Sequence, residues 1–470
     1  MSKRLIATFD FGTTAIKFVV VNGNLEKVYS AKQNIDTYFE NGFIEQSPKQ
    51  WYEVFKNLLC SYEERDKIDS FIFSGQMQDL IFIDGKGNAI GNAILYNDQR
   101  ARNYVKTVND SFKSLTYLDF NGSIPLLKYY WMCDKKPNVI KETTNILFSP
   151  KDYISSKLTG RFVVDATTAS TTGMINIKKC EYCLNLDPNL KTCLPELLFS
   201  DNIIGKVKPV VSAELGLSEG DINVFVGVGD AGATTFASGI EKPGDININL
   251  GTSGWISTVS NTPRAGVFNL RAVQRNRYIN VIPILNAGSV HKWVSGLVFG
   301  SDGKKYDKME NFLSDSKNYE TTLLCLPYLV GERFPVADSD VRGCFIGLEP
   351  STSLLDMSIS ALEGVAFSLK QGMEKLEVTP KSISIIGGGA LEPFWNQIFA
   401  DVLEQDIITF SNSEFLPSQA LAKIALYIEG NLINHISEIK IFHPHVERFS
   451  SYRKKYLIFK KIYPAIRTLF

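Results

Sequence analysis

The stretch Leu5-Ile6-Ala7-Thr8-Phe9-Asp10-Phe11-Gly12-Thr13-Thr14-Ala15-Ile16-Lys17-Phe18-Val19-Val20-Val21 decides the fold. β-Branched and aromatic residues dominate both sides of Gly12, which is typical of two strands joined by a tight turn. In Walker and Rossmann loops the glycine turn opens a helix, whereas here strand residues follow it. The stretch therefore predicts a β-hairpin with strands over residues 5–9 and 16–21.

The same pattern returns half a chain later. Residues 246–250 lead into Gly251-Thr252-Ser253-Gly254, and another β-rich run covers residues 255–259. A shift of 239 residues (251 − 12) superposes the two Gly-Thr turns, and only the first carries a carboxylate, Asp10. A chance match of two short turns is the alternative. The repeat predicts a duplicated α/β domain, with domains at 1–243 and 244–470 around a central cleft.

Length and charge exclude several classes of protein. The chain has 470 residues, of which 44% are hydrophobic, too many for a disordered protein. Lys plus Arg is 50 and Asp plus Glu is 50, so a nucleic-acid partner is not expected, because nucleic-acid binders usually carry a basic surplus. Apolar runs stay short of the roughly 18–20 residues that span a bilayer, so a membrane is not expected either.

Seven cysteines are scattered along the chain, and Cys180 and Cys183 form a lone CxxC. A zinc site would need a second such pair or nearby histidines, and the sequence has only four histidines. We therefore expect reduced thiols. Because the N-terminus also shows no secretory leader, we expect a cytoplasmic protein.

Three further segments combine a structural interpretation with a functional one. Residues 224–235 read as a strand followed by small residues, with Asp230 at the strand end as a helix N-cap or a ligand contact. Residues 383–386 read as a strand that ends in three glycines, 387–389, before a helix at 395–403, and a flexible turn is the simpler interpretation. The basic and aromatic stretch 448–467 is expected to pack its aromatic residues on the body of the protein.

These motifs, in this order, resemble the FGGY family of carbohydrate kinases, with a match from about residue 5 to about residue 430. The stretch Ser123–Met132 resembles one family signature, and this chain departs from that signature only at its end, where Lys135 stands. The spaced run from Gly343 to Glu363 resembles the other signature. Gly75-Gln76-Met77, residues 93–100 and residues 326–333 are similar to the xylulokinase branch. The resemblance implies two duplicated ribonuclease H-like domains of the actin, Hsp70 and hexokinase type.

The resemblance also implies ATP and Mg²⁺ as cofactors and a role for each motif. Asp230 would be the general base, with an ordinary pKa near 4, and Asp10 would be the Mg²⁺ partner. The nucleotide would be held by residues of the two Gly-Thr turns, of the glycine loop 387–389 and by one further glycine. These residues are Gly12, Thr13, Thr14, Lys17, Gly251, Thr252, Gly288, Gly388 and Gly389. Gln76, Met77 and Gln78 would contact the sugar together with Asp230, and Asn97 and Asp98 are further candidates.

The expected partners are a small sugar and ATP, and a homodimer is left open. Xylulokinases usually have His where this chain has Gln78 and Asn where it has Ala231. Both changes fall where sugar hydroxyls would bind. The candidate substrates are therefore D-xylulose and, as alternatives, ribulose, another ketose, a polyol such as glycerol, or an aldonate such as gluconate. A non-catalytic ATP-binding switch is the alternative from another class, and the intact Asp10 and Asp230 argue against it.

Overall fold

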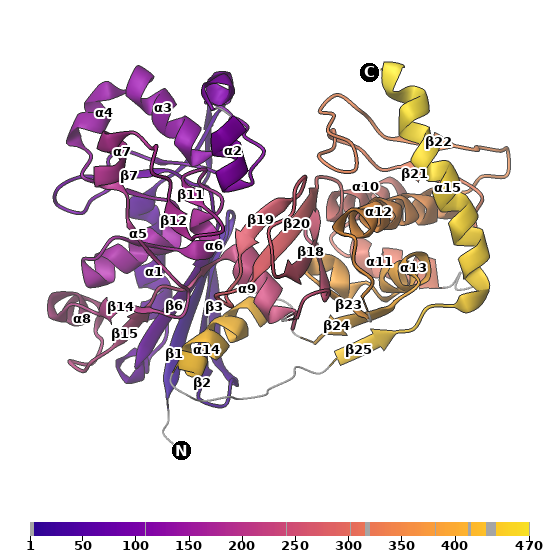
Figure 1. Cartoon of the computed structure of the whole chain (residues 1–470). Helices are drawn as coiled ribbons and strands as arrows, with labels where there is room; N and C mark the ends of the chain where they lie inside the picture. The colour runs from indigo at the N-terminus through magenta and orange to yellow at the C-terminus, as the bar shows by residue number, and fades with distance from the viewer. Residues whose placement is uncertain are drawn as a thin grey trace. The chain divides into compact units, whose positions relative to one another are not determined.

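The protein is described by a computed structural model that covers residues 4–108, 110–240, 242–300, 302–314, 320–380, 382–411, 415–428 and 439–469. Two compact units divide the chain (Figure 1). Unit 1 comprises residues 1–237, 260–279 and 415–435, and unit 2 comprises 238–259, 280–414 and 436–470. The boundary predicted from the sequence, between residues 243 and 244, would assign residues 260–279 and 415–435 to the second domain. In the structure both segments belong to unit 1.

Unit 1 is built on a mixed sheet in which the predicted hairpin is central. β1 and β2 are antiparallel with Asp10 opposite Lys17, which confirms the hairpin. β6 and β15 continue the sheet in parallel on the other side of β1, and β16 also pairs with β6. The order is β14-β15-β6-β1-β2-β3, with bounds Ile203–Lys206, Asn223–Phe225, Ser70–Gly75, Leu5–Phe11, Ala15–Asn22 and Lys27–Asn34, and β16 is Val228–Gly229.

Apolar side chains of β1 point alternately to the two faces of this sheet, so helices cover both faces. Ala7, Phe9 and Phe11 point into one core, with α1 (Pro48–Cys60), α5 (Pro150–Thr159) and α8 (Pro209–Leu215). Ile6 points into the opposite core, with α9 (Asp230–Ala237) and α14 (Leu416–Ile428). Packing of α14 on this face is the physical reason why a segment so late in the sequence belongs to unit 1.

Shorter elements complete unit 1, and most of them contribute residues to a separate apolar cluster. They are β4 (Tyr38–Glu40), β5 (Phe43–Gln46), β7 (Ile81–Ile83), β8 (Ala93–Ile94), α2 (Asp110–Thr116), α3 (Pro125–Lys135), α4 (Pro137–Glu142), β9 (Asn145–Leu147), β10 (Val163–Asp165), α6 (Ala166–Ala169), β11 (Ile175–Asn176), β12 (Glu181–Tyr182), α7 (Pro188–Cys193), β13 (Glu196–Leu198) and β19 (Phe268–Arg271).

Unit 2 repeats the pairing pattern of unit 1. β17 (Ile246–Leu250) is antiparallel to β18 (Gly254–Ser260) and parallel to β23 (Ser382–Ile386), as β1 is to β2 and β6. The order β20-β18-β17-β23-β24-β25 continues with β20 (Tyr278–Ile284), β24 (Asp406–Phe410) and β25 (Ile439–Phe442). The second hairpin and the strand before the glycines are thereby confirmed, and so is the duplicated α/β fold.

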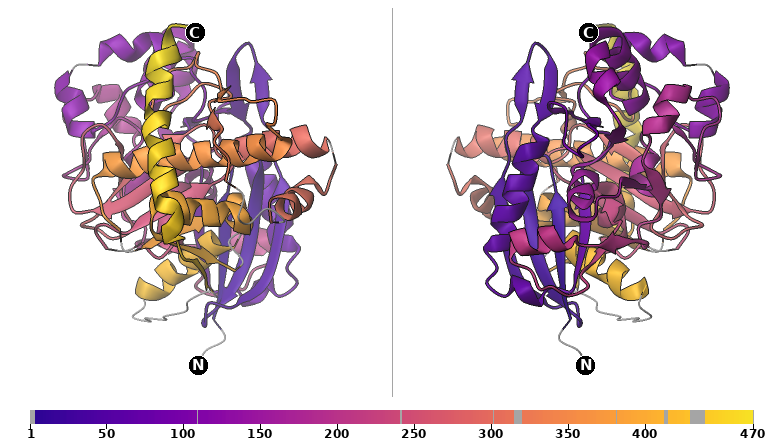
Figure 2. Two further views of the ribbon diagram at one scale, coloured as in Figure 1. Left: turned by 90° about the vertical axis from the view of Figure 1, so that its right-hand side faces the viewer. Right: turned by 90° about the vertical axis from the view of Figure 1, so that its left-hand side faces the viewer.

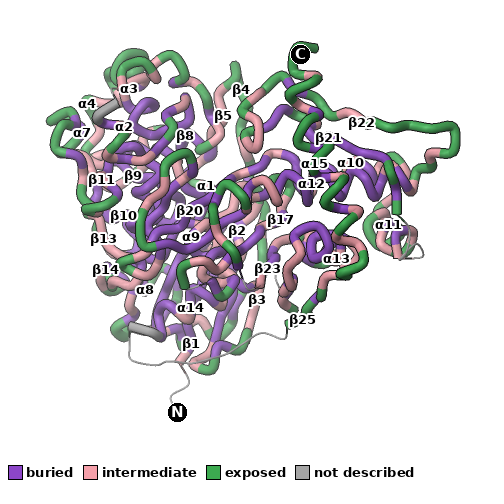
Figure 3. Tube along the Cα trace, turned by 45° about the vertical axis from the view of Figure 1, so that its right-hand side comes forward, coloured by how far each residue is buried: buried purple, intermediate pink, exposed green. Residues whose placement is uncertain are grey.

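Helices surround the sheet of unit 2, and Figure 3 colours most of α13 as buried. They are α10 (Gly288–Phe299), α11 (Lys305–Ser314), α12 (Leu354–Leu376), α13 (Pro393–Leu403) and α15 (Phe449–Ile466), beside the hairpin of β21 (Leu324–Leu326) and β22 (Cys344–Ile346).

The basic C-terminal stretch forms α15, which runs across α12 in the left view of Figure 2. It buries Tyr452, Tyr456 and Phe459, as the sequence predicts. Its Lys455 reaches the buried Glu363 of α12. Within the part of the chain that the structure describes, helices long and apolar enough to cross a membrane are absent.

Candidate active site

Three parallel strands of unit 1 end side by side and bring the polar candidates of that unit to one edge of the sheet. Asp10 is paired with Ser74 across β1 and β6, and Val228 is paired with the same Ser74 across β6 and β16. Gln76 follows β6 directly, and Asp230 follows β16 directly. Strand ends of this kind are the usual ligand sites of α/β folds.

Two buried glutamines form hydrogen bonds with the first Gly-Thr turn and fix its position. Thr13 donates its hydroxyl to Gln76 Oε1 (2.9 Å), and Gln46 Nε2 donates to the Thr13 carbonyl (2.7 Å). The two glutamines are joined because Gln76 Nε2 donates to Gln46 Oε1 (3.1 Å). The amide of Gly12 donates to Ala15 O (3.1 Å) inside the turn. Because the Gly12 amide and the Thr13 hydroxyl are already used within the protein, a phosphate cradle on this turn would use the backbone amides of Thr13 and Thr14.

Asp10 is half-buried and faces both the turn and β6. Its Oδ1 accepts a hydrogen bond from Ser74 Oγ (2.7 Å), and Lys17 stands opposite on β2, on the same face of the hairpin. Among the described residues, groups of three or more potential metal ligands are absent. One carboxylate beside a phosphate cradle still fits Mg²⁺, which commonly takes one or two carboxylates and keeps waters and substrate phosphates as its other ligands.

Asp230 begins α9, and its environment favours the protonated form. Desolvation raises its pKa, the negative charge of Asp10 raises it further, and a hydrogen bond from the amide of Ala231 (2.7 Å) opposes both effects. The result is a pKa of about 7. The expected ordinary value near 4 is therefore wrong, because the sequence does not show how much water this strand end loses.

A buried ion network of three side chains fixes residues 226–229, the segment that directly precedes Asp230. Lys151 lies between Asp152 (2.6 Å) and Asp165 (2.7 Å), and all three side chains are at most 1% exposed. Lys151 Nζ donates to Val226 O (3.5 Å), and the amide of Gly229 donates to Asp165 Oδ2 (3.4 Å). The two ends of the segment before Asp230 are thereby tied to one ion network.

Met77 and Gln78 form a wall next to this segment. A Cβ at Gly229 would lie 2.1 Å from Met77 Sδ, so only glycine allows this approach. Gln78 has a left-handed backbone (φ 67°), and its side-chain amide donates to Thr171 O (3.3 Å). Lys128 fixes the same backbone by donating to Gln78 O (3.0 Å).

The remaining sugar-site candidates differ in their availability. Asp98 is fully buried and bound to Arg100 (2.7 Å) and to the amide of Ile44 (2.7 Å), so its carboxylate is already committed. Asn97 keeps a buried Oδ1 that has no hydrogen-bond partner within the described ranges. Gln76 is engaged with the Thr13 turn, as described above.

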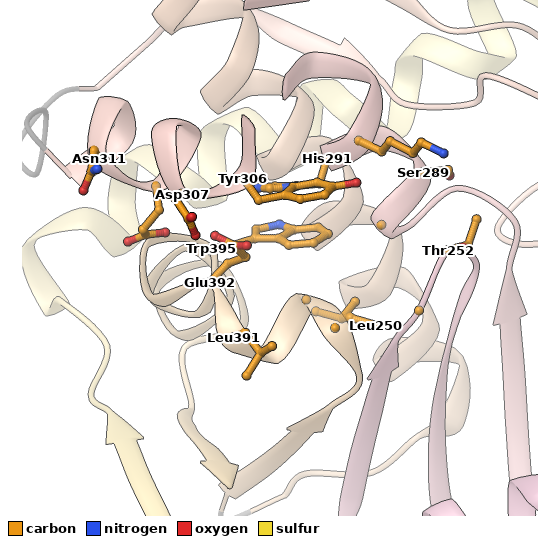
Figure 4. Close-up of a pocket in the computed structure, with 16 residues that line it drawn as sticks. Leu250, Thr252, Ser289, His291, Tyr306, Asp307, Asn311, Leu391, Glu392 and Trp395 are labelled. Atoms are coloured by element: carbon orange, nitrogen blue, oxygen red, sulfur yellow. The ribbon is translucent and has the colours of Figure 1, made fainter. Parts of the chain in front are cut away.

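Unit 2 contains a pocket of about 660 Å³, drawn in Figure 4. Its lining includes the predicted Gly251, Thr252, Gly288, Gly388 and Gly389. The start of α10 is tied to the second Gly-Thr turn, because the amides of Gly288 and Ser289 donate to Gly251 O and Thr252 O (2.9 Å each). The structure thus brings together the five unit 2 residues that the sequence singled out.

Bare backbone and stacked rings form two walls of this pocket. A Cβ at Gly388 would meet no atom within 4 Å, so this glycine faces open space. The rings of Tyr306, His291 and Trp395 are stacked, with centroids 5.5 and 5.4 Å apart (Figure 4). The pocket suits a flat ligand that carries phosphates, because helix starts and glycine turns favour anions.

Sequence reasoning missed several residues of both sites. Lys292, Glu310 and Glu392 line the unit 2 pocket, as do the three stacked rings. In unit 1 it missed Asp79, which is fully buried and accepts a hydrogen bond from the amide of Tyr96 (3.1 Å). Only Lys128 carried a signal, because it lies inside the Ser123–Met132 stretch.

Comparison with known proteins supplies the family. The model for the N-terminal domain of the FGGY family of carbohydrate kinases matches residues 5–237, and the model for its C-terminal domain matches residues 246–415. The chain belongs to the FGGY family of carbohydrate kinases.

Relatives of this FGGY kinase match over nearly their whole length. It is 31% identical to a xylulose kinase of Staphylococcus xylosus, covering 97% of this chain and 98% of the relative, and 29% identical to one of Staphylococcus epidermidis, covering 100% and 98%. A gluconokinase of Bacillus subtilis is 24% identical over 85% of this chain and 83% of its own.

Solved structures agree with the fold of the FGGY kinase. A ligand-bound xylulose kinase from Lactobacillus acidophilus superposes with a TM-score of 0.88 at 24% identity, covering 99% of this chain and 98% of that one. A glycerol kinase from Plasmodium falciparum, solved with ADP, gives 0.85 at 19% identity, covering 100% and 99%. The chain therefore has the two-domain, actin-like ATPase fold.

Proposed function

We propose that this FGGY kinase transfers the γ-phosphate of ATP to a hydroxyl of a ketopentose, with D-xylulose as the leading substrate, and that it works in the cytoplasm. The observation that carries the proposal is the placement of Asp10, Gln76 and Asp230 at the ends of three neighbouring strands of unit 1, and the raised pKa of Asp230 supports it. The names of the staphylococcal relatives support the choice of sugar.

Asp230 would act as the general base in this reaction. It would first orient the attacking hydroxyl and then accept its proton on a carboxylate oxygen. A carboxyl with a pKa near 7 is a better match to this task than one near 4, because base strength and the ionised fraction are both substantial at neutral pH.

Phosphate groups would be held by backbone and by cations of this chain. Thr13 and Thr14 would bind them from one turn, Thr252 from the other, and Lys17 would add a positive charge. Asp10 would hold Mg²⁺ through waters. When bound, Mg²⁺ neutralises charge on the transferring phosphoryl group.

The electrostatics near Asp230 favour a neutral sugar over an aldonate. Burial and the negative charge of Asp10 both raise the pKa of Asp230, so a substrate carboxylate beside Asp230 would meet further negative charge. Burial lowers the pKa of Lys128 to about 7, and its amine already donates to the carbonyls of Gln78 and Leu95 (3.0 and 2.6 Å). A gluconate kinase, which the Bacillus subtilis relative would suggest, is the second candidate.

A coupled ADP-release assay tests the proposal. Purified protein, ATP and Mg²⁺ are combined with D-xylulose, D-ribulose, glycerol or D-gluconate, and kcat/KM is measured for each. The highest value is expected with D-xylulose. A higher value with gluconate overturns the choice of sugar, and no sugar-stimulated ADP release on any acceptor overturns the kinase assignment and favours a nucleotide switch.

A further inference from the structure

The unit 2 pocket is polarised from one end to the other. Thr252 and Ser289, beside the glycine turn, lie at one end, whereas Asp307, Asn311 and Glu392 lie at the opposite end (Figure 4). The stacked rings stand between the two ends. A nucleotide whose phosphates meet Thr252 would therefore extend its nucleoside toward carboxyl groups.

Two carboxyl groups at that end act as a pair. Glu310 accepts hydrogen bonds from the amide of Phe394 (3.3 Å) and from Ser314 Oγ (2.9 Å), which fix it between α11 and α13. It is also hydrogen-bonded to Glu392, and burial together with Glu310 and Asp307 raises the pKa of Glu392 to about 7. Because Glu310 is already held by its neighbours, Glu392 is the member of the pair that can meet a ligand.

His291 gives an independent sign that a polar ligand belongs in this pocket. Its side chain is 4% exposed and lines the pocket, and its Nε2 has no hydrogen-bond partner within the described part of the chain. Burial lowers the pKa of His291 to about 4, so the ring is neutral at pH 7. A buried polar atom without a partner costs free energy that a ligand hydrogen bond would recover.

We propose that Glu392, backed by Glu310, determines the nucleotide specificity of this pocket by accepting a hydrogen bond from the amino group of adenine. The inference rests on the proposed function, because it takes the pocket to be the ATP site. It adds a residue that selects the phosphoryl donor.

Adenine and hypoxanthine differ in the group that such a carboxylate would meet. The proton that this carboxyl pair keeps near neutral pH lies in the hydrogen bond between Glu392 and Glu310, so the other oxygen of Glu392 acts as an acceptor. The N6 amino group of adenine donates to such an acceptor, whereas the O6 carbonyl of hypoxanthine would face it as a second acceptor. A site built to pair with one polar group rejects an analogue that leaves its own groups unpaired. We expect kcat/KM to be at least about tenfold lower with ITP than with ATP in the wild-type enzyme.

Glu392→Gln is the informative variant, because the amide keeps the shape of the side chain and can donate to O6 as well as accept from N6. The ratio of kcat/KM for ATP to that for ITP should fall to within about threefold of unity. Asp302→Asn, which removes one negative charge from unit 2 outside the pocket, serves as the control and should keep the wild-type ratio. Circular dichroism and thermal melting establish that each variant is folded.

The ribose is the competing contact, and 2′-deoxy-ATP distinguishes it. If Glu392 holds a ribose hydroxyl, Glu392→Gln changes the ratio for ATP to 2′-deoxy-ATP and leaves the ATP to ITP ratio as it was, which overturns the proposal. Equal use of ITP and ATP by the wild type also overturns it while the kinase function stands. If ATP supports no sugar phosphorylation, the proposed function fails and the inference fails with it.

Discussion

Asp230 makes the reaction sensitive to pH, because a base must be ionised to accept a proton. Desolvation and the charge of Asp10 raise its pKa to about 7, so the carboxyl is mostly protonated at pH 6 and mostly ionised at pH 8. We expect kcat/KM for the sugar, measured at saturating ATP from pH 5.5 to 8.5, to rise with pH and to reach its midpoint at or below about 7, because Mg²⁺ at Asp10 would offset part of the charge that raises the pKa of Asp230. Asp230→Ala should lose nearly all sugar-dependent turnover and keep ATP affinity. A variant with near wild-type kcat would show that another group is the base.

Gln78 is the residue through which the choice of sugar can be tested. Its side-chain amide is tied to Thr171 O (3.3 Å), and Lys128 holds its backbone. Gln78→His should raise kcat/KM for D-xylulose if the natural substrate is a different sugar, because the imidazole restores the group that the xylulokinase branch has there. Kinetics on a panel of ketoses measure the effect, and an unchanged ranking would remove Gln78 from the specificity argument.

The buried ion network of Lys151 should contribute to the free energy of unfolding. Replacing Lys151 with Met leaves Asp152 and Asp165 buried without their cation, and breaking such a network costs about 3–5 kcal/mol. We expect Lys151→Met to lower the free energy of unfolding in urea by that amount. Lys56→Met is the matched control. It removes a half-exposed ion pair to Glu214, so a loss below about 1 kcal/mol is expected. Equal losses in both variants would contradict the prediction.

Single residues also mark what the sequence could and could not predict about the site. Asp10, Asp230 and the glycines of unit 2 stand out because strand patterns place them at turns and strand ends. The commitment of Asp98 to Arg100 depends on a side-chain contact that spacing does not show. The pairing of Glu310 on α11 with Glu392, the residue before α13, joins positions more than 80 residues apart, so no local pattern could predict it.

At the scale of elements, the loop between β23 and α13 offers a test of the nucleotide pocket. A Cβ at Gly388 meets no atom within 4 Å, so Gly388→Val should fold normally and project its side chain into the pocket. We expect ATP binding, measured by calorimetry, to weaken by at least about tenfold while stability changes by less than about 0.5 kcal/mol.

The neighbouring glycine is the control for this loop. A Cβ at Gly389 would lie 2.7 Å from Leu250 Cβ and 3.0 Å from Trp395 Cζ3, so Gly389→Ala should destabilise the protein by about 1–3 kcal/mol through overpacking. If Gly388→Val leaves ATP affinity unchanged, the nucleotide does not approach this loop.

Elements were predictable where one local rule decides them. Alternation and β-branched residues predict both hairpins and the strand before the glycines, and the aromatic residues of α15 predict its buried face. The assignment of α14 to unit 1 follows instead from packing against β1 and β6, which are more than 300 residues away in the sequence. Tertiary contacts of this range leave no periodic signal in the chain.

For the whole molecule, the separation of the two sites between two units predicts which segments each ligand protects. D-Xylulose without nucleotide should slow hydrogen exchange of backbone amides in unit 1, around residues 76–79 and 227–231. A non-hydrolysable ATP analogue without sugar should protect residues 250–252 and 387–392 of unit 2, because these residues line or border its pocket, and residues 12–14 of unit 1, which would hold its phosphates. Each ligand at 100 times its Kd should also stabilise the protein by about 2.7 kcal/mol. Protection of residues 387–392 by the sugar alone, with none from the ATP analogue, would contradict the assignment of the nucleotide to unit 2.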